Sequence, residues 1–111
     1  VIDFATNLTL GSATSLPAVA GRASISTTGL ATFAAADDTL SEQIAAAANA
    51  LISSGAVAAG SSVTWQLGSD SYLFISDGNT AVSATDVLVK INSTSTTGLT
   101  ISAGGDITSF V

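Results

Sequence analysis

The side chains best suited to bind a cation lie close together in the second half of this sequence. Asp77-Gly78-Asn79 comes first, and Asp86 follows at the start of a predicted strand. Asp-x-Asn spacing lets two oxygen-bearing side chains of one turn point at the same hard cation, and oxygen atoms are the ligands that Ca²⁺ takes in proteins. We therefore predict Asp77, Asn79 and Asp86 as candidate metal ligands, with calcium as the candidate cofactor.

A second interpretation of the same residues needs no ion. An Asp-Gly-Asn turn commonly connects two strands, because Asp and Asn side chains hydrogen-bond to the backbone of their own turn. An EF-hand loop that began at Asp77 would need oxygen-bearing side chains where this chain has Ala81 and Leu88, and a glycine where it has Val82. The EF-hand motif is absent, and a plain turn and a calcium site of another kind remain as alternatives.

Side chains that usually drive catalysis are scarce. The chain has no Cys and no His, so it lacks a thiolate, the usual general base and the usual transition-metal ligand. No Ser has a Lys dyad or a Gly-x-Ser-x-Gly context that would activate it as a nucleophile. Asp37, Asp38 and Glu42 lie where a predicted helix begins, and the helix dipole favours negative charge there, so we interpret them as a cap. The sequence predicts a protein that is not an enzyme.

Composition limits the partners that the chain can bind. Its eight acidic residues outnumber Arg22 and Lys90 and give a net charge of −6, which leaves no basic patch for nucleic acid. Charged residues make up only 9% of the sequence, so small polar and apolar residues must cover the surface. Such a surface loses few strongly hydrated groups on contact, which favours packing against copies of itself. The longest apolar tract is far shorter than the ~20 residues that a membrane span needs.

One segment, from about residue 38 to residue 54, has the pattern of an amphipathic helix. Thr39-Leu40-Ser41-Glu42 fits a capping box, and Gly55 provides a C-terminal stop. One face of this helix carries the apolar side chains of Leu40, Ile44, Ala47, Leu51 and Ile52. We expect this face to pack against a sheet.

Strands are predicted on both sides of the helix. The runs with strand-like alternation or β-rich composition are residues 2–10, 23–26, 30–33, 62–67, 71–76, 86–91, 99–103 and 107–111. The 111 residues suffice for one domain with one core. We predict a single α+β domain, residues 1–111, of mainly antiparallel strands with the helix covering the sheet. Much of the core should come from the aromatic residues Phe4, Phe33, Trp65, Tyr72 and Phe74.

The N-terminal segment, residues 1–10, is separated from the other predicted strands by a loop through Pro17. It could therefore pair with a neighbouring copy as readily as with its own sheet, since main-chain hydrogen bonds serve either partner. We expect self-association through unpaired strand edges, and through this segment above all.

Several short motifs resemble one known group of proteins. Val1-Ile2-Asp3-Phe4 resembles the closing strand of the glycine- and aspartate-rich repeat that builds calcium-loaded β-rolls in RTX proteins. The motifs Ala31-Thr32-Phe33 and Asp37-Asp38-Thr39-Leu40, with residues 70–77 and 86–91, resemble the C-terminal domain that follows such repeats in type I-secreted and surface-layer-like bacterial proteins.

The resemblance implies an extracellular or cell-surface location, calcium dependence and export through a type I secretion channel. Residues 106–111 fit the acidic-then-apolar ending of such export signals. The first functional hypothesis is a structural subunit or C-terminal domain of an extracellular self-assembling protein, either a surface layer or a filament. The alternative is an export and folding module of a larger secreted enzyme or adhesin. A third possibility is a free-standing enzyme or a carbohydrate-binding module, in which Trp65 and Tyr72 would stack on sugars.

Overall fold

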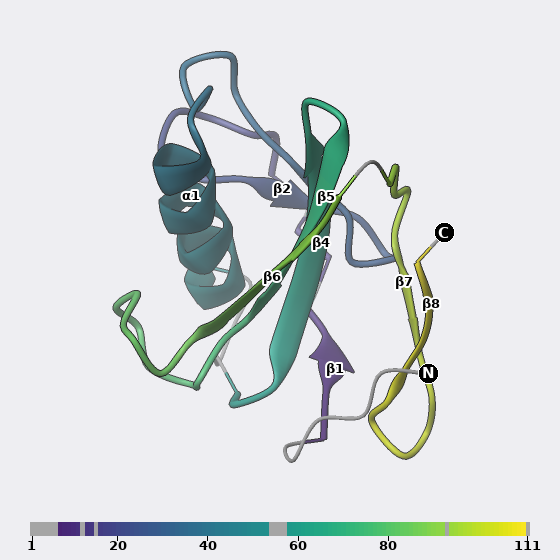
Figure 1. Cartoon of the computed structure of the whole chain (residues 1–111). Helices are drawn as coiled ribbons and strands as arrows, with labels where there is room; N and C mark the ends of the chain where they lie inside the picture. Colours follow the sequence, from purple (N-terminus) through teal and green to yellow (C-terminus); the bar gives the residue numbers. More distant parts are fainter. Residues whose placement is uncertain (1–6, 12, 15, 54–57, 93, 111) are drawn as a thin grey trace.

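The computed structural model describes residues 7–11, 13–14, 16–53, 58–92 and 94–110. Along these residues the helix lies on one side of the largest sheet, and a C-terminal hairpin lies on the other side (Figure 1). The elements in chain order are β1 (Thr9–Leu10), β2 (Ser24–Ile25), β3 (Ala31–Thr32), α1 (Leu40–Ser53), β4 (Ser61–Leu67), β5 (Asp70–Ile75), β6 (Val87–Ile91), β7 (Leu99–Ile101) and β8 (Ile107–Phe110).

The largest sheet has four strands in the order β1-β4-β5-β6. Strand β1 runs parallel to β4, whereas the β4–β5 and β5–β6 pairs are antiparallel. Strands β2 and β3 form a second, two-stranded sheet, and β7 and β8 form a third. The predicted α+β fold of mainly antiparallel strands is thus confirmed, although the strands of the described residues form three sheets where one was expected.

The two long strands β4 and β5 are joined by a tight turn. Gly68 has a φ of 64° there, in the left-handed region that side chains with a Cβ rarely adopt. The strands then pair over their whole length, so that Trp65 lies opposite Tyr72 and Val63 opposite Phe74. This hairpin forms the centre of the domain.

The central strand β5 packs on both of its faces. Its side chains point alternately to opposite sides, so Tyr72 and Phe74 enter one hydrophobic cluster while Leu73 and Ile75 enter another. The first cluster joins the helix to the sheet, through the buried residues Ala23, Ile25, Ala31, Ala46, Ala47, Ala50, Leu51, Val63 and Trp65. The second joins the C-terminal hairpin to the sheet through Leu8, Leu99 and Ile107. Burial on both faces explains why this strand is a nearly unbroken apolar run in the sequence.

Small hydroxyl side chains are also buried in these strands. The Ser62 hydroxyl donates to the Gly60 carbonyl (2.9 Å), and the Thr64 hydroxyl donates to the Tyr72 carbonyl (2.8 Å). The Ser71 hydroxyl likewise donates to the carbonyl of Thr94. Since each hydroxyl has a partner, its burial costs little free energy, and these residues serve the fold.

Helix α1 begins with the predicted capping box. The Thr39 hydroxyl accepts a hydrogen bond from the Glu42 backbone N–H (3.3 Å), and the Glu42 carboxylate accepts one from the Thr39 backbone N–H (3.1 Å). These two bonds satisfy backbone donors that have no partner inside the helix. The predicted helix start and cap are therefore confirmed.

The buried face of α1 differs in part from the predicted one. Ala46, Ala47 and Ala50 have 0% exposure, so small residues make the central contact. Leu51 is buried as predicted, and Leu40 and Ile44 pack partly buried against the same cluster. Ile52 is only half-buried. The sequence pattern favoured long aliphatic side chains, whereas alanines let the helix backbone approach the strands closely.

The N-terminal segment pairs within its own chain where it is described. Thr9 lies opposite Ser61 in the sheet, and the Leu8 N–H donates to the Gly105 carbonyl (3.0 Å). Residues 8–10 thus pair within their own chain here, and pairing of this segment with a neighbouring copy stays a prediction. Residues 1–6, with the RTX-like motif and Phe4, lie outside the described residues, as does Gly55. Among the described residues, no helix has the length and hydrophobicity that crossing a membrane requires.

Candidate functional site

The loop between β5 and β6, residues 76–86, holds the three predicted metal ligands. Asp77 Oδ1 accepts a hydrogen bond from the Asn79 backbone N–H (2.8 Å), and Asp77 Oδ2 accepts one from the Asn79 side-chain amide (2.9 Å). The hydroxyls of Ser83 (3.3 Å) and Thr85 donate to the same Oδ2 atom. The Asp77 carboxylate thus accepts hydrogen bonds from residues near both ends of the loop.

Asp86 closes the loop from its other end. Its Oδ1 accepts the backbone N–H of Asp77 (2.9 Å), and its Oδ2 accepts the backbone N–H of Ser83 (2.8 Å). The structure therefore brings Asp77, Asn79 and Asp86 together, as the sequence predicted. The contacts of the Ser83 and Thr85 hydroxyls with this loop were not predicted. The sequence contains many Ser and Thr residues, and no motif distinguishes these two from the others.

The hydrogen bonds to Asp77 stabilise its charged form. The Thr85 hydroxyl has the largest effect, and the backbone and side-chain N–H groups of Asn79 add to it, so the pKa of Asp77 lies well below its usual range. A carboxylate with such a lowered pKa stays ionised at neutral pH. The loop therefore carries a negative charge at neutral pH that its own donors stabilise.

These same oxygen atoms would have to change partners in order to bind calcium. Ca²⁺ takes about six to eight oxygen ligands, whereas here all four carboxylate oxygens of Asp77 and Asp86 accept hydrogen bonds from the loop. Each of them accepts at least one bond from an N–H group, which a cation would repel. Among the described residues, no group of three or more His, Cys, Asp or Glu side chains is placed to hold a metal ion. The arrangement fits the plain turn, and calcium at these residues stays a prediction.

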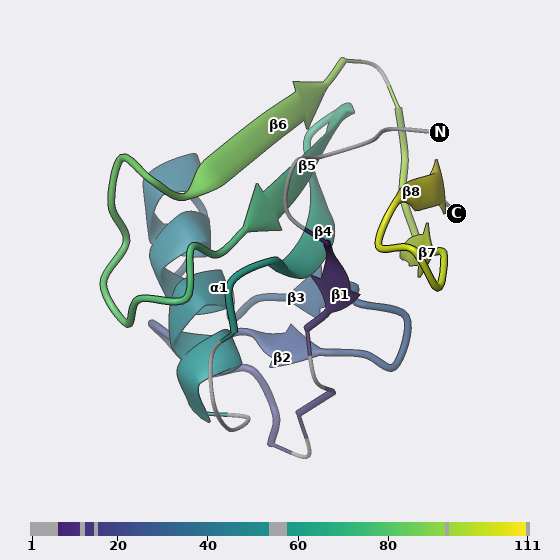
Figure 2. The same cartoon turned by 90° about the horizontal axis from the view of Figure 1, so that it is seen from below.

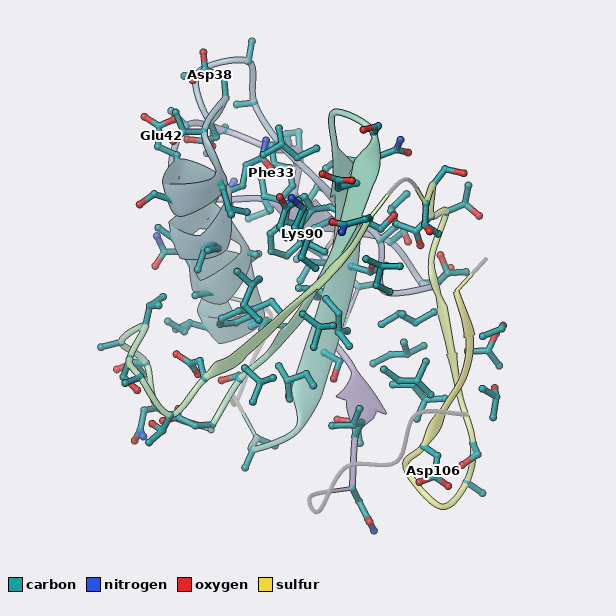
Figure 3. All side chains as sticks on the ribbon, viewed as in Figure 1. Phe33, Asp38, Glu42, Lys90 and Asp106 are labelled. Carbon is teal, nitrogen blue, oxygen red and sulfur yellow. The ribbon has the colours of Figure 1, made fainter. Side chains whose placement is uncertain are left out.

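The other carboxylates of the described residues lie away from this loop. Asp38 and Glu42 lie together where α1 begins, while Asp106 lies in the turn of the C-terminal hairpin (Figure 3). Hydrogen bonds from Thr39 lower the pKa of Glu42. Asp37 is buried, and its carboxylate accepts the Gly21 N–H at 3.1 and 3.0 Å, which ties the preceding loop to the start of the helix. We therefore assign structural roles to the carboxylates at the helix start, as the sequence predicted.

The aromatic residues pack against one another inside the first cluster. The Trp65 and Tyr72 rings stack with centroids 6.0 Å apart, and Phe33 meets the Trp65 ring edge-on at 5.5 Å. Trp65 is only 1% exposed. The prediction that these aromatics form core is confirmed, and neither Trp65 nor Tyr72 offers an open ring face on which a sugar could stack.

Exposed apolar side chains lie at β6 and in the loop before it, as they also do at Leu16 and Val19. Val82, just before this strand, and Val87 and Leu88 within it are 49%, 40% and 40% exposed. Strand β6 is the last strand of its sheet, and in the described part of the chain no strand pairs with its outer edge. Figure 2 shows β6 at the outside of the molecule. The sequence predicted this strand but not its position, because position in a sheet depends on long-range pairing.

Strand β6 carries one charged side chain. The Lys90 ammonium lies 3.2 Å from the Asp70 carboxylate across the β5–β6 pair, and this neighbour raises the pKa of Lys90. Lysines on edge strands usually discourage pairing with other chains. In the described part of β6 this ion-paired lysine is the only charged side chain that could discourage pairing.

No family model matches this chain, and no curated protein or solved structure shows significant similarity to it.

Proposed function

We propose that this chain is a structural domain of an extracellular, self-assembling bacterial protein, in a surface layer or a filament, and that its copies associate through strand edges. The observation that carries the proposal is the open edge of β6, whose residues Val87 and Leu88 are exposed. Soluble proteins protect such edges with prolines, bulges or several charged side chains. β6 has no proline, and its one lysine is paired.

The composition supports the same function. With only 9% charged residues, two copies can approach without stripping water from many ammonium or carboxylate groups. The buried Ser and Thr side chains belong to the fold, and the described carboxylates mostly serve caps and turns. The extracellular location and the export by a type I secretion channel rest on the resemblance of the short motifs described above.

Self-association of the purified chain tests this function. Size-exclusion chromatography with light scattering, over a wide range of concentrations, should show a mass that rises above 10.8 kDa as the concentration rises. Negative-stain microscopy of the concentrated sample, with and without calcium, should show whether the association continues into an ordered array or filament. A monomer mass at every concentration under both conditions would reject the proposal.

A further inference from the structure

We infer that the partner of the β6 edge is the β6 strand of a second copy, paired antiparallel about a two-fold axis at Val89. This inference rests on the proposed function and names the contact through which the copies meet. It follows from the direction of the backbone hydrogen bonds and from the charges along the strand.

The hydrogen bonds of β5 show toward which neighbouring strand the backbone N–H and C=O groups of each residue point. Antiparallel ladders alternate between hydrogen-bonded and non-hydrogen-bonded residue pairs. The Ser76 N–H donates to the Ser61 carbonyl (2.9 Å), so Phe74 and Tyr72, two and four residues back along the chain, also turn their backbone groups toward β4. Leu73, between them, turns its groups toward β6.

The same alternation continues into β6. Leu73 lies opposite Val89, and Val89 therefore points its N–H and carbonyl back to β5. Leu88 and Lys90 must then point theirs outward, where no described residue pairs with them. The open edge thus offers two residues, each with one donor and one acceptor, placed symmetrically about Val89.

This pattern is complementary to itself. In an antiparallel pair centred on Val89, Leu88 lies opposite the partner's Lys90, and Lys90 lies opposite the partner's Leu88. Each of these pairs exchanges two backbone hydrogen bonds. On the other face Val89 meets the partner's Val89, and Val87 meets the partner's Ile91, which are β-branched pairs that pack well across strands.

Neighbouring registers are less favourable. A shift by one residue would place outward-pointing groups opposite inward-pointing ones. A centre at Lys90 would oppose two like charges directly. A centre at Leu88 would need the backbone N–H of Asp86, which already donates to the Ser83 carbonyl (3.2 Å). The pairing centred on Val89 is the register that uses every open group without opposing charges.

The contact is small, and this sets the conditions for its detection. A single five-residue strand pair buries less than the ~1,200 Å² that marks the lower end of stable interfaces, so the isolated chain should associate weakly. Each copy carries a net charge of −6, and the long-range repulsion is screened by salt. Association should therefore strengthen at high protein concentration and at moderate ionic strength.

Single-cysteine crosslinking tests the register directly, because the natural chain has no Cys. In the proposed pair the two copies of residue 89 have Cα atoms about 4.5 Å apart, within the ~4.4–6.8 Å that a disulfide spans. Val89→Cys should therefore form disulfide dimers under mild oxidation. Val87→Cys is the matched control, since the two copies of residue 87 would lie more than about 10 Å apart, too far for a disulfide, and should crosslink much more slowly.

Two substitutions of opposite charge at the exposed residue Leu88 give an independent test. Leu88→Glu would place a carboxylate opposite the partner's Lys90, whereas Leu88→Lys would place a second ammonium there. We expect Leu88→Glu to associate at lower concentration than Leu88→Lys. Long-range charge alone predicts the reverse order, because Leu88→Glu makes an acidic chain more acidic. Circular dichroism should show the same folded spectrum for both variants.

The outcomes separate this inference from the function on which it rests. Fast crosslinking of Val89→Cys, together with the predicted order of the two Leu88 variants, supports the pairing. Equal crosslinking at positions 87 and 89, or tighter association of Leu88→Lys, overturns the register while the proposed function stands if the parent chain still associates. A parent chain that stays monomeric overturns both.

Discussion

Replacement of Leu73 by Ala should destabilise the whole domain, because the two hydrophobic clusters share strand β5. Leu73 is fully buried in the cluster that contains Leu99 and Ile107. The adjacent residues Tyr72 and Phe74 belong to the other cluster, together with the helix. A cavity on one face of β5 should therefore weaken the packing on its other face.

The magnitude follows from the atoms removed. Loss of the three outer carbons of Leu73 removes about 2.4 kcal/mol of transfer free energy, at about 0.8 kcal/mol per carbon. The remaining cavity raises the total to about 3–4 kcal/mol. Domains of this kind have about 5–15 kcal/mol of stability, and each kcal/mol corresponds to about 4 °C for a domain of this length. Tm should therefore fall by about 12–16 °C.

Trp65 makes the assay informative. It is the only Trp of the chain and is buried in the cluster on the opposite side of the sheet from Leu73. Urea unfolding followed by Trp fluorescence should show a lower midpoint for Leu73→Ala with an unchanged slope. Leu16→Ala is the matched control, because Leu16 is 51% exposed and its loss should cost less than about 0.5 kcal/mol. An unchanged Trp65 transition in Leu73→Ala would refute the coupling between the two clusters.

Five further experiments test the loop, the helix and the N-terminal segment. Asp86→Ala removes the acceptor of two backbone N–H groups and should lower the free energy of unfolding by about 1 kcal/mol. If calorimetry detects calcium binding by the parent chain, the heat of binding should vanish in the Asp77→Ala, Asp86→Ala double variant. The same heat in both chains would eliminate this site. The folded pKa of Asp77 is lowered, so its contribution to stability is present above the unfolded pKa of about 4 and is lost as the pH falls from there toward the folded pKa. As the pH falls below about 4, the free energy of unfolding should therefore decrease less for Asp77→Asn than for the parent chain. Identical pH profiles of the two chains would contradict this. Ala47→Leu, in the fully buried helix face, should cost about 1–3 kcal/mol by overpacking, whereas Ala45→Leu on the exposed face should be nearly neutral in thermal melts. Deletion of residues 1–10 should unfold the domain, since residues 9 and 10 pair with β4; a truncated chain with an unchanged circular dichroism spectrum and a smaller assembly would restore the intermolecular alternative.

Local signals were enough to predict most elements. The capping box of α1 depends on residues three apart, and the turn at Gly68 depends on one glycine. Both signals act over a few neighbouring residues, so the sequence alone contains them. The helix, the β4–β5 hairpin and the strand before Asn92 were therefore predicted within a few residues of their observed bounds.

Features that depend on long-range pairing could not be predicted in the same way. The separation of Leu73 from Tyr72 into different clusters requires the C-terminal hairpin to pack on one side of the sheet and the helix on the other. The edge position of β6 depends on which strand pairs with β5. The candidate ligands were found because they lie within one loop, but whether their oxygen atoms accept N–H donors or face a cation depends on the backbone path between them.

The acidic loop and the open edge are connected through Asp86. Its carboxylate holds the backbone N–H groups of Asp77 and Ser83, and its own N–H donates to the Ser83 carbonyl. These bonds fix the residue from which β6 starts, and they leave Leu88 as its first residue whose backbone groups pair with no described residue on the outer edge. Bound in this way, the loop sets the length and the register of the edge. In the proposed pairing, Asp77 and Asp86 would therefore serve association through the strand that they position.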